Sequence, residues 1–394
     1  MLINKARAIA LMKEHNVDAL VASYAANVNY LSGYYSLSQN LIRDTQVYAV
    51  ITADIETPPV VVAPIGDLDC MADKGPFGPV ETYGSFFVYR DHSGEQRPEF
   101  DRLWKYHQLE RSKTPLDALA QALKRLGVGQ SRIAIDTIGM TPAIKKELHA
   151  KFDKAQIIEG YDLLKVIRMV KTPEELRRLR ESARITEQAI AATLEAAEEG
   201  ISERELEAVF CRSIVSAGAR PLLTCIGVGS RTAMINTIPS DHKLKKGDLI
   251  RFDVGCVYES YCSDIARIAS FGTPSDKVKQ YYQALLDGEQ AAINIIKPGI
   301  TAADVFNKAI AVTRAMGIPH YERHHCGHGI GIECYDLPSI TAADTTMLEE
   351  GMVINVETPY YELGFAGLQV EDTVVVAKDG FEYLTTYDRS LQVI

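Results

Sequence analysis

Short apolar runs alternate with amphipathic segments through about the first 160 residues of the chain. Runs of this kind, bounded by turn-forming residues, are typical of buried strands. The segments between them carry helix signals, such as Thr141-Pro142, with Pro in the first turn. Strands that alternate with helices predict an α/β layer domain with a mixed sheet. The predicted strands cover residues 17–21, 47–51, 60–63 and 133–135.

A change of pattern between residues 164 and 171 predicts a domain boundary. Thr172-Pro173-Glu174-Glu175 forms a capping box, and apolar residues then recur at helical spacing. Gly200 is the predicted C-terminal cap of this helix, and Ser202 starts the next helix in the same way. We therefore expect an N-terminal α/β domain over residues 1–165 and a second domain over residues 166–394.

Two stretches of the second domain, 244–253 and 348–357, share one pattern. In each, Leu and two charged residues precede a Gly, and an acidic residue follows six residues after that Gly. The junctions before them are also alike, Gly200-Ile201-Ser202 and Gly299-Ile300-Thr301. The repeat predicts an internal duplication, in which each half has a helix pair followed by a strand hairpin with two acidic residues. Two hairpins related by a pseudo-twofold axis would bring four carboxylates to one centre.

These four carboxylates, Asp253, Asp264, Glu357 and Glu371, point to a metal centre. Like charges in a half-buried cleft raise one another's pKa, and bound cations remove that conflict. The alternative, acidic residues scattered over a solvated face, fits poorly with the apolar residues beside them. With His328 as a fifth donor, an oxygen-rich set with one imidazole favours Mn²⁺, Co²⁺, Fe²⁺ or Zn²⁺. Five ligands suffice for two metal ions that share bridging carboxylates.

Composition narrows the class of protein. The 394 residues carry a formal net charge of −10, which argues against nucleic acid as a partner. No apolar run approaches the roughly 20 residues of a membrane span, and no secretory signal follows Met1. The seven cysteines are odd in number and form no CxxC pair, which is typical of reduced thiols. We therefore expect a cytoplasmic protein with no nucleic-acid or membrane partner.

The chain carries four motifs in this order: Asp253 with Asp264, Gly327-His328-Gly329-Ile330-Gly331, Glu357, and Glu371-Asp372-Thr373. Together they resemble the pita-bread metallopeptidase family, which includes prolidase, aminopeptidase P, methionine aminopeptidase and the non-metal enzyme creatinase. Residues 27–34 are also similar to the start of the creatinase and prolidase N-terminal domain. The resemblance implies a creatinase-type α/β domain, a pita-bread catalytic domain with a pseudo-twofold duplication, and a homodimer.

The same resemblance assigns the metal ligands. Asp253 would hold one metal ion and His328 with Glu357 the other, while Asp264 and Glu371 would bridge them. The expected cofactor is two divalent ions, with manganese first and cobalt, zinc or iron as alternatives. Creatinase has lost these ligands, whereas this chain has kept all five.

The chain departs from the peptidases at positions that contact substrate rather than metal. Asn236 stands where the family usually has His in a Pro-His pair, and Tyr335 replaces a His seven residues after the metal-binding His. Gln369 stands where prolidase-like enzymes often carry Arg, while His324 is retained. We expect Asn236, Tyr335 and Gln369 to bind substrate, and His324 and Glu357 to act in catalysis. A lost donor to an oxyanion costs about 10²–10³ in rate, so the replacements predict a changed substrate.

The leading interpretation is a dinuclear metallohydrolase that cleaves an amide or related C–N bond in a small peptide-like or amino-acid-derived molecule. Glu357 would carry the proton to the leaving nitrogen. A lyase that uses the same metals for β-elimination is an alternative, and solvent oxygen in the product separates the two. A genuine Xaa-Pro dipeptidase or aminopeptidase is a second alternative, and a non-catalytic module on the same scaffold is the third.

One segment has two interpretations, and three residues near the predicted site are expected to have no role in it. The aromatic-rich segment 83–110 is either an irregular excursion packed on its own domain or an arm that reaches an active site, even a partner subunit's. His325 is expected to be solvated beside His324. Cys326 and Cys334 flank the predicted site, but better ligands are present, so we expect no thiolate ligation.

Overall fold

A computed structural model describes residues 2–42, 44–54, 56–75 and 78–394. The chain divides into two compact units, Met1–Arg168 and Met169–Ile394. Among the described residues, no helix is both long enough and apolar enough to cross a membrane.

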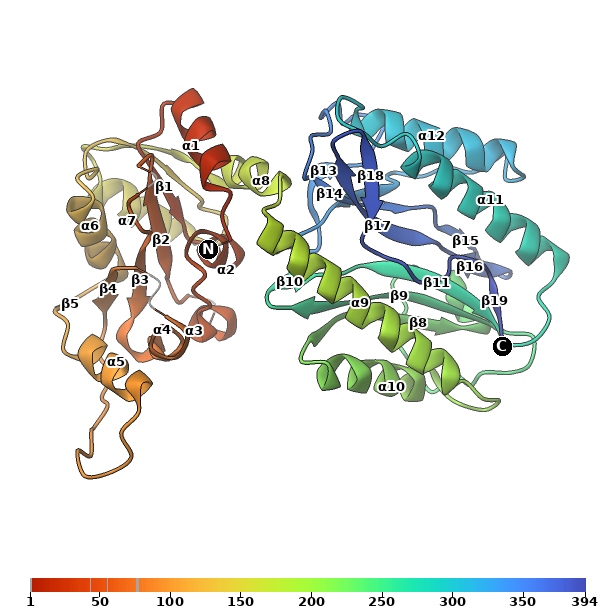
Figure 1. Ribbon diagram of the computed structural model, residues 1–394, viewed down its shortest axis with the longest axis horizontal. Helices are drawn as coiled ribbons and strands as arrows, with labels where there is room; N and C mark the ends of the chain where they lie inside the picture. Colours follow the sequence, from red (N-terminus) through yellow and green to blue (C-terminus); the bar gives the residue numbers. More distant parts are fainter. Residues whose placement is uncertain (1, 43, 55, 76–77) are drawn as a thin grey trace. The chain divides into compact units, whose positions relative to one another are not determined.

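The first unit contains a seven-stranded sheet with the strand order β5-β4-β3-β2-β1-β6-β7 (Figure 1). β1 pairs antiparallel with β2 and parallel with β6, so the sheet is mixed, as predicted. The four predicted strands are confirmed as β1, β2, β3 and β6. The strands are β1 (Ala19–Ala22), β2 (Tyr48–Thr52), β3 (Val60–Pro64), β4 (Val80–Tyr83), β5 (Arg111–Ser112), β6 (Arg132–Ile135) and β7 (Gln156–Glu159).

Helices pack on this sheet through small and branched apolar residues. Leu119 and Leu123 of α6 join Val50, Val62 and other strand residues in one buried cluster. The predicted start of α7 is confirmed, because the Thr141 side chain accepts a hydrogen bond from the Ile144 amide. The helices are α1 (Lys5–Glu14), α2 (Ala25–Ser32), α3 (Leu37–Leu41), α4 (Asp69–Lys74), α5 (Pro98–His107), α6 (Pro115–Arg125), α7 (Pro142–Lys151) and α8 (Tyr161–Met169).

The aromatic-rich segment forms α5 and the long loop before it, which Figure 1 shows projecting away from the strands. Phe87 and Tyr89 on that loop are 76% and 91% exposed, so they do not pack on their own unit. Trp104 of α5 contacts His92 edge-on, with ring centroids 6.5 Å apart.

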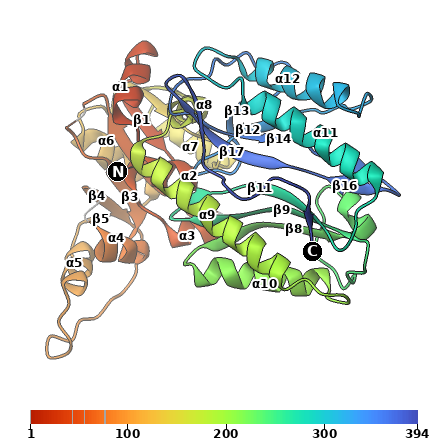
Figure 2. The same cartoon turned by 45° about the vertical axis from the view of Figure 1, so that its right-hand side comes forward.

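The second unit contains a ten-stranded sheet with two helix pairs, α9–α10 and α11–α12, lying along it (Figures 1 and 2). Its main path is β10-β9-β11-β17-β14-β12-β13, with β8, β18 and β19 added at the sides. A small sheet pairs β15 (Tyr360–Glu362) with β16 (Ala366–Leu368). The helices are α9 (Pro173–Glu195), α10 (Glu203–Ser216), α11 (Asp276–Ile293) and α12 (Ala302–Ala315). The large-sheet strands are β8 (Arg220–Val228), β9 (Leu249–Tyr258), β10 (Tyr261–Cys262), β11 (Ile265–Ser270), β12 (Gly327–Gly329), β13 (Asp336–Ser339), β14 (Val353–Glu357), β17 (Glu371–Ala377), β18 (Gly380–Tyr383) and β19 (Gln392–Val393).

The helix starts of this unit follow the capping prediction, but one helix end does not. Thr172 and Ser202 each form a complete capping box with the Glu three residues later. α9 ends at Glu195, five residues before Gly200. Gly200 instead takes a φ of 90° in the following turn, where its amide donates to the Leu244 carbonyl at 2.8 Å. The expected cap is therefore a turn that joins the helix pair to the sheet.

The two halves repeat that turn. The Gly299 amide donates to the Leu348 carbonyl at 3.0 Å, as Gly200 does to Leu244. Isolated bridges then join Ser202 to Lys243 and Thr301 to Met347. Equivalent residues of the repeat thus make equivalent contacts, which supports the predicted internal duplication.

Candidate metal centre

The sheet register places three of the predicted acids in one row. Asp253 on β9 pairs with Ala266 on β11, Ala266 pairs with Glu371 on β17, and Glu371 pairs with Glu357 on β14. Residues directly opposite one another on neighbouring strands direct their side chains to the same face. Asp264 lies just before β11. The hairpins predicted from the sequence therefore converge at the centre of the second unit.

His328 completes the cluster from β12. Its Nε2 lies 3.7 Å from Asp264 Oδ2 and 4.0 Å from Glu371 Oε1. One donor atom from each of these three residues lies within 4.8 Å of the others, and all three residues are buried. His328 Nδ1 lies 2.9 Å from the Gly329 carbonyl, which can only accept, so Nδ1 carries the proton and Nε2 has a free lone pair. Burial also lowers the pKa of His328 and keeps the ring neutral.

Two glycines allow the close packing that holds the His328 strand. A Cβ on Gly327 would lie 2.0 Å from the Asn355 carbonyl oxygen, and one on Gly329 would lie 2.0 Å from the Leu337 carbonyl oxygen. Gly327 also has a φ of 133°, which side-chain-bearing residues rarely adopt. The glycines of the predicted motif therefore set the position of the imidazole.

The donor set fits a divalent cation. Among the described residues, His328 Nε2 and Asp264 Oδ1 are buried and have no hydrogen-bond partner. Burying such atoms without a partner is costly, so their convergence is typical of a metal site. Asn355 supports the set by donating from Nδ2 to Glu371 Oε1 at 3.0 Å. Carboxylate oxygens with one imidazole match the preferences of Mn²⁺, Fe²⁺, Co²⁺ and Zn²⁺.

Without a cation, the cluster holds conflicting charges. Burial is the main cause that raises the pKa of Asp253 to about 6, with Arg251 opposing and Glu357 adding to the shift. Burial and the neighbouring Asp253 raise the pKa of Asp264 well above its usual value. Burial and the charge of Asp264 do the same for Glu371. Protonation relieves the repulsion in the metal-free protein, and a cation would relieve it in the loaded protein.

We expect the stability of the metal-free protein to fall as the pH rises above the ordinary carboxyl pKa of 3.8 and through about 6, where Asp253 loses its proton. An acid whose pKa is higher in the folded state than in the unfolded chain holds more protons when folded, so the free energy of unfolding decreases as pH rises. The raised pKa values of Asp253, Asp264 and Glu371 all act in this direction. Thermal unfolding of chelator-treated protein at stepped pH measures the effect. Metal-saturated protein is the control, and its unfolding midpoint should change less with pH. A midpoint of the metal-free protein that rises with pH would contradict the prediction.

Glu357 has different surroundings from the other acids. His325 Nε2 lies 2.9 Å from Glu357 Oε1, and Gln369 Nε2 donates to Oε2 at 3.4 Å. Burial raises the pKa of Glu357, but the His325 hydrogen bond and the Arg323 charge outweigh it, and the pKa lies below its usual value. Glu357 therefore stays ionised. His325, expected to be solvated, is the imidazole that contacts Glu357, whereas His324 is exposed, with its Nδ1 3.5 Å from His325 Nδ1.

The two neighbouring histidines should respond differently to removal. We expect His325→Ala to lower metal affinity about 10- to 100-fold, because His325 orients a ligand carboxylate from outside the metal shell. His324→Ala should lower turnover while metal content stays near that of the wild type. Metal analysis and steady-state kinetics on both variants measure this. Metal loss in His324→Ala that parallels the loss of activity would show that His324 is not a substrate contact.

The three residues predicted to contact substrate differ from one another in exposure and in hydrogen bonding. Asn236 is exposed on the segment between η2 (Gly229–Ala233) and β9. Tyr335 is 62% exposed and stacks on the His328 ring, with centroids 3.9 Å apart. Gln369 is only 2% exposed, and its Oε1 accepts from Arg251 Nη1 at 2.8 Å. Asn236 and Tyr335 are thus open to a ligand, while the Gln369 amide is bonded within the protein.

The sequence prediction missed Arg251. This guanidinium is fully buried and donates from Nη2 to the Met234 and Ile235 carbonyls, both at 2.7 Å. It also donates from Nη1 to Asp253 Oδ2 at 3.2 Å. Arg251 is two residues before Asp253 on a strand, and such residues share a face, so the spacing could have revealed it. Arg251 therefore ties the segment before Asn236 to the ligand strand.

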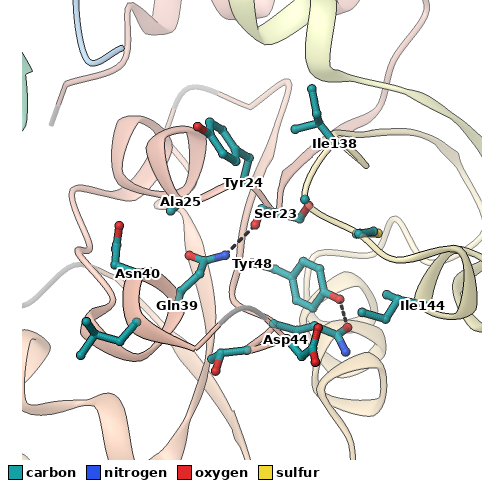
Figure 3. Close-up of a pocket in the computed structure, with 14 residues that line it drawn as sticks. Ser23, Tyr24, Ala25, Gln39, Asn40, Asp44, Tyr48, Ile138 and Ile144 are labelled. Carbon is teal, nitrogen blue, oxygen red and sulfur yellow. Dashed lines mark hydrogen bonds between the residues drawn. The ribbon is translucent and has the colours of Figure 1, made fainter. Parts of the chain in front are cut away.

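A separate cavity of about 580 Å³ lies in the first unit, after the ends of β1 and β6 (Figure 3). Gln39 Nε2 donates to the Ser23 carbonyl at 2.6 Å beside it, and the Tyr48 hydroxyl contacts the Gln46 side chain. None of the predicted catalytic, substrate or metal residues lines this cavity. All of those predicted residues belong to the second unit.

Comparison with known proteins gives matches along almost the whole chain. Residues 177–378 match metallopeptidase family M24, and residues 5–170 match the creatinase/prolidase N-terminal domain. The Xaa-Pro dipeptidase of Pyrococcus horikoshii is 29% identical over 386 residues, which are 97% of this chain and 97% of that protein. The crystal structure of the prolidase from P. horikoshii OT3 superposes with a TM-score of 0.79 at 27% identity, covering 98% of this chain and 99% of that one. The prolidase from Pyrococcus furiosus gives 0.75 at 26% identity, covering 97% and 100%. These matches confirm the predicted two-domain pita-bread fold.

Proposed function

Because the chain belongs to metallopeptidase family M24 and is a metal-dependent peptidase, we propose that it hydrolyses an amide bond in a small peptide-like or amino-acid-derived substrate. The proposal includes two divalent ions, manganese first, and substrate contacts that differ from those of the Xaa-Pro dipeptidases. The proposal also includes the homodimer and the cytoplasmic location that were expected from the sequence.

The ligand roles follow the positions of the five side chains. Asp253 would hold one ion, His328 and Glu357 the other, and Asp264 and Glu371 would share both. Support comes from the convergence of Asp264, Glu371 and the unprotonated Nε2 of His328. Divalent ions held there would polarise the scissile carbonyl and lower the pKa of water.

The protein groups around these ligands would orient the substrate and move the proton. Glu357 is ionised and can take a proton at Oε1 or Oε2 and return it to the leaving nitrogen. His325 Nε2, 2.9 Å from Oε1, holds that carboxylate in place. The exposed Asn236 amide and Tyr335 phenol can donate hydrogen bonds to the substrate. Gln369 would act through Glu357, to which it donates.

The observation that carries the proposal is the buried Asp264–His328–Glu371 cluster with its unpartnered donor atoms. The test is metal analysis after reconstitution with Mn²⁺, Co²⁺, Fe²⁺ or Zn²⁺, followed by incubation with a dipeptide mixture in H₂¹⁸O. We expect two ions per chain, activity lost on chelation, and one ¹⁸O in the new carboxylate. Product without ¹⁸O would favour a lyase, and no more than trace metal would overturn the proposal.

A further inference from the structure

Two arginine side chains lie beside Tyr361 at the metal centre. The Arg251 guanidinium carbon is 5.2 Å from the Tyr361 ring centroid, and that of Arg323 is 5.9 Å from it. Both side chains border predicted ligands, Arg251 through Asp253 and Arg323 through Glu357. Their hydrogen bonding is very different, and this difference indicates separate roles.

Arg251 has little left to offer a ligand. Its side chain has no exposed surface. Nη2 is occupied by two backbone carbonyls at 2.7 Å, and Nη1 by Gln369, Asp253 and the Tyr361 hydroxyl at 2.8, 3.2 and 3.4 Å. This guanidinium is a structural tie within the sheet.

Arg323 keeps its terminal nitrogens available. Its side chain is 18% exposed, and its Nη2 lies 4.0 Å from Glu357 Oε1, which is too long for a hydrogen bond. Nε makes one long bond, 3.4 Å, to the His325 carbonyl. Within the described ranges, no other carboxylate lies within 4.0 Å of this guanidinium. A mostly buried guanidinium is stabilised by two parallel bonds to a carboxylate, and Arg323 has none.

We propose that Arg323 binds a carboxylate of the substrate, so that the substrate is a peptide or amino-acid derivative with a free carboxylate near the scissile bond. The proposal rests on the function proposed above. Gln369 holds the position where prolidase-like relatives often carry Arg, and it is bonded to the buried Arg251. The cation that binds the substrate carboxylate would therefore come from the segment before β12 instead of from the position of Gln369, between β16 and β17. Arg323 would be a specificity-determining residue.

The alternative role for Arg323 is to balance the charge of Glu357 alone. In that role its removal would affect every substrate equally, with or without a carboxylate. A carboxylate-binding role instead predicts an effect that depends on the substrate's charge. The two roles are therefore separated by comparing acids with their amides.

The first experiment needs no turnover. Calorimetry on metal-loaded protein compares L-proline and L-leucine with prolinamide and leucinamide. Because the acids can form charge-assisted hydrogen bonds to Arg323, we expect the wild type to bind them about 10- to 100-fold more tightly than the amides. Arg323→Met should abolish that preference, and Arg323→Lys should keep part of it, because Lys is a point charge without the planar fork. Arg180→Met is the matched control, since Arg180 is 46% exposed and pairs with Glu382.

The second experiment measures KM and kcat for dipeptides and for their C-terminal amides. Arg323→Met should raise KM for the acids about 10- to 100-fold while changing the amides little. Equal losses for acids and amides, or a wild type without any preference for acids in the calorimetry, overturn the proposal. Metal content equal to the wild type shows that the variant is folded. If the wild type cleaves no dipeptide with any metal, the proposed function fails, and the calorimetry still decides the role of Arg323.

Discussion

Asp264→Asn and Glu371→Gln should each reduce kcat/KM by more than about 10³-fold, beyond the loss caused by one missing transition-state donor. Both residues are 2% exposed and lie against His328 at the centre of the cluster. In the proposed arrangement each contacts both ions, so one substitution weakens two metal sites. Metal content should fall together with activity. Steady-state kinetics and elemental analysis on the same preparations measure both.

The same substitutions should change stability in opposite directions with and without metal. In the metal-free protein, each replaces a buried carboxyl group whose pKa is raised by burial and then by its neighbouring carboxylates, so the unfolding midpoint should rise. With saturating Mn²⁺, the wild type gains binding free energy that the variants lose, so their midpoint should be lower. Asp241→Asn is the control, because its side chain is 82% exposed. Full metal content and activity in Asp264→Asn would exclude a bridging role.

The parts of the fold that sequence could predict are those set by local chemistry or by repetition. Capping boxes at Thr172 and Ser202 need only a residue and its neighbour three positions later. The convergence of the acids could be predicted because the duplication repeats the spacing from Gly to acid in both halves. In the structure, β14 and β17 pair antiparallel and place Glu357 directly opposite Glu371, as the predicted strand hairpin requires.

The parts that sequence could not predict depend on contacts between distant segments. The spacing of Arg251 from Asp253 is visible in the sequence, but the hydrogen bond from Arg251 to Gln369 spans 118 positions and depends on the fold. His324 and His325 are adjacent, so no spacing rule shows which one faces Glu357. Gly200 could equally end a helix or form a turn, and its bond to Leu244, a long-range contact, selects the turn. Residue types predicted a metal centre, but the neighbours that hold its side chains could be identified only from the fold.

Xaa-Pro dipeptides should be turned over at least about 10²-fold more slowly than by a typical prolidase. In our proposal, Asn236 and Tyr335 stand at the positions from which His side chains contact the substrate in the peptidases. Neither side chain titrates near neutrality as His does. The structure adds that the Tyr335 ring stacks on the His328 ring, with centroids 3.9 Å apart, which limits where its phenol can point. Gln369 supplies no charge at the position where an Arg often stands, and its amide is already bonded to Arg251.

Restoring the imidazoles tests this explanation directly. Asn236→His and Tyr335→His, singly and together, should raise Xaa-Pro turnover, with the double variant gaining more than either single one. Both residues are exposed, so the substitutions should leave metal content and the unfolding midpoint close to the wild type. Exposed Ile238→His is the matched control, since it adds an imidazole at an 82% exposed position two residues beyond Asn236. A panel of Xaa-Pro substrates with each metal supplies the rates. A wild-type kcat/KM above about 10⁴ M⁻¹s⁻¹, the lower end for ordinary enzymes, would refute the changed-substrate proposal and identify the chain as a genuine Xaa-Pro peptidase.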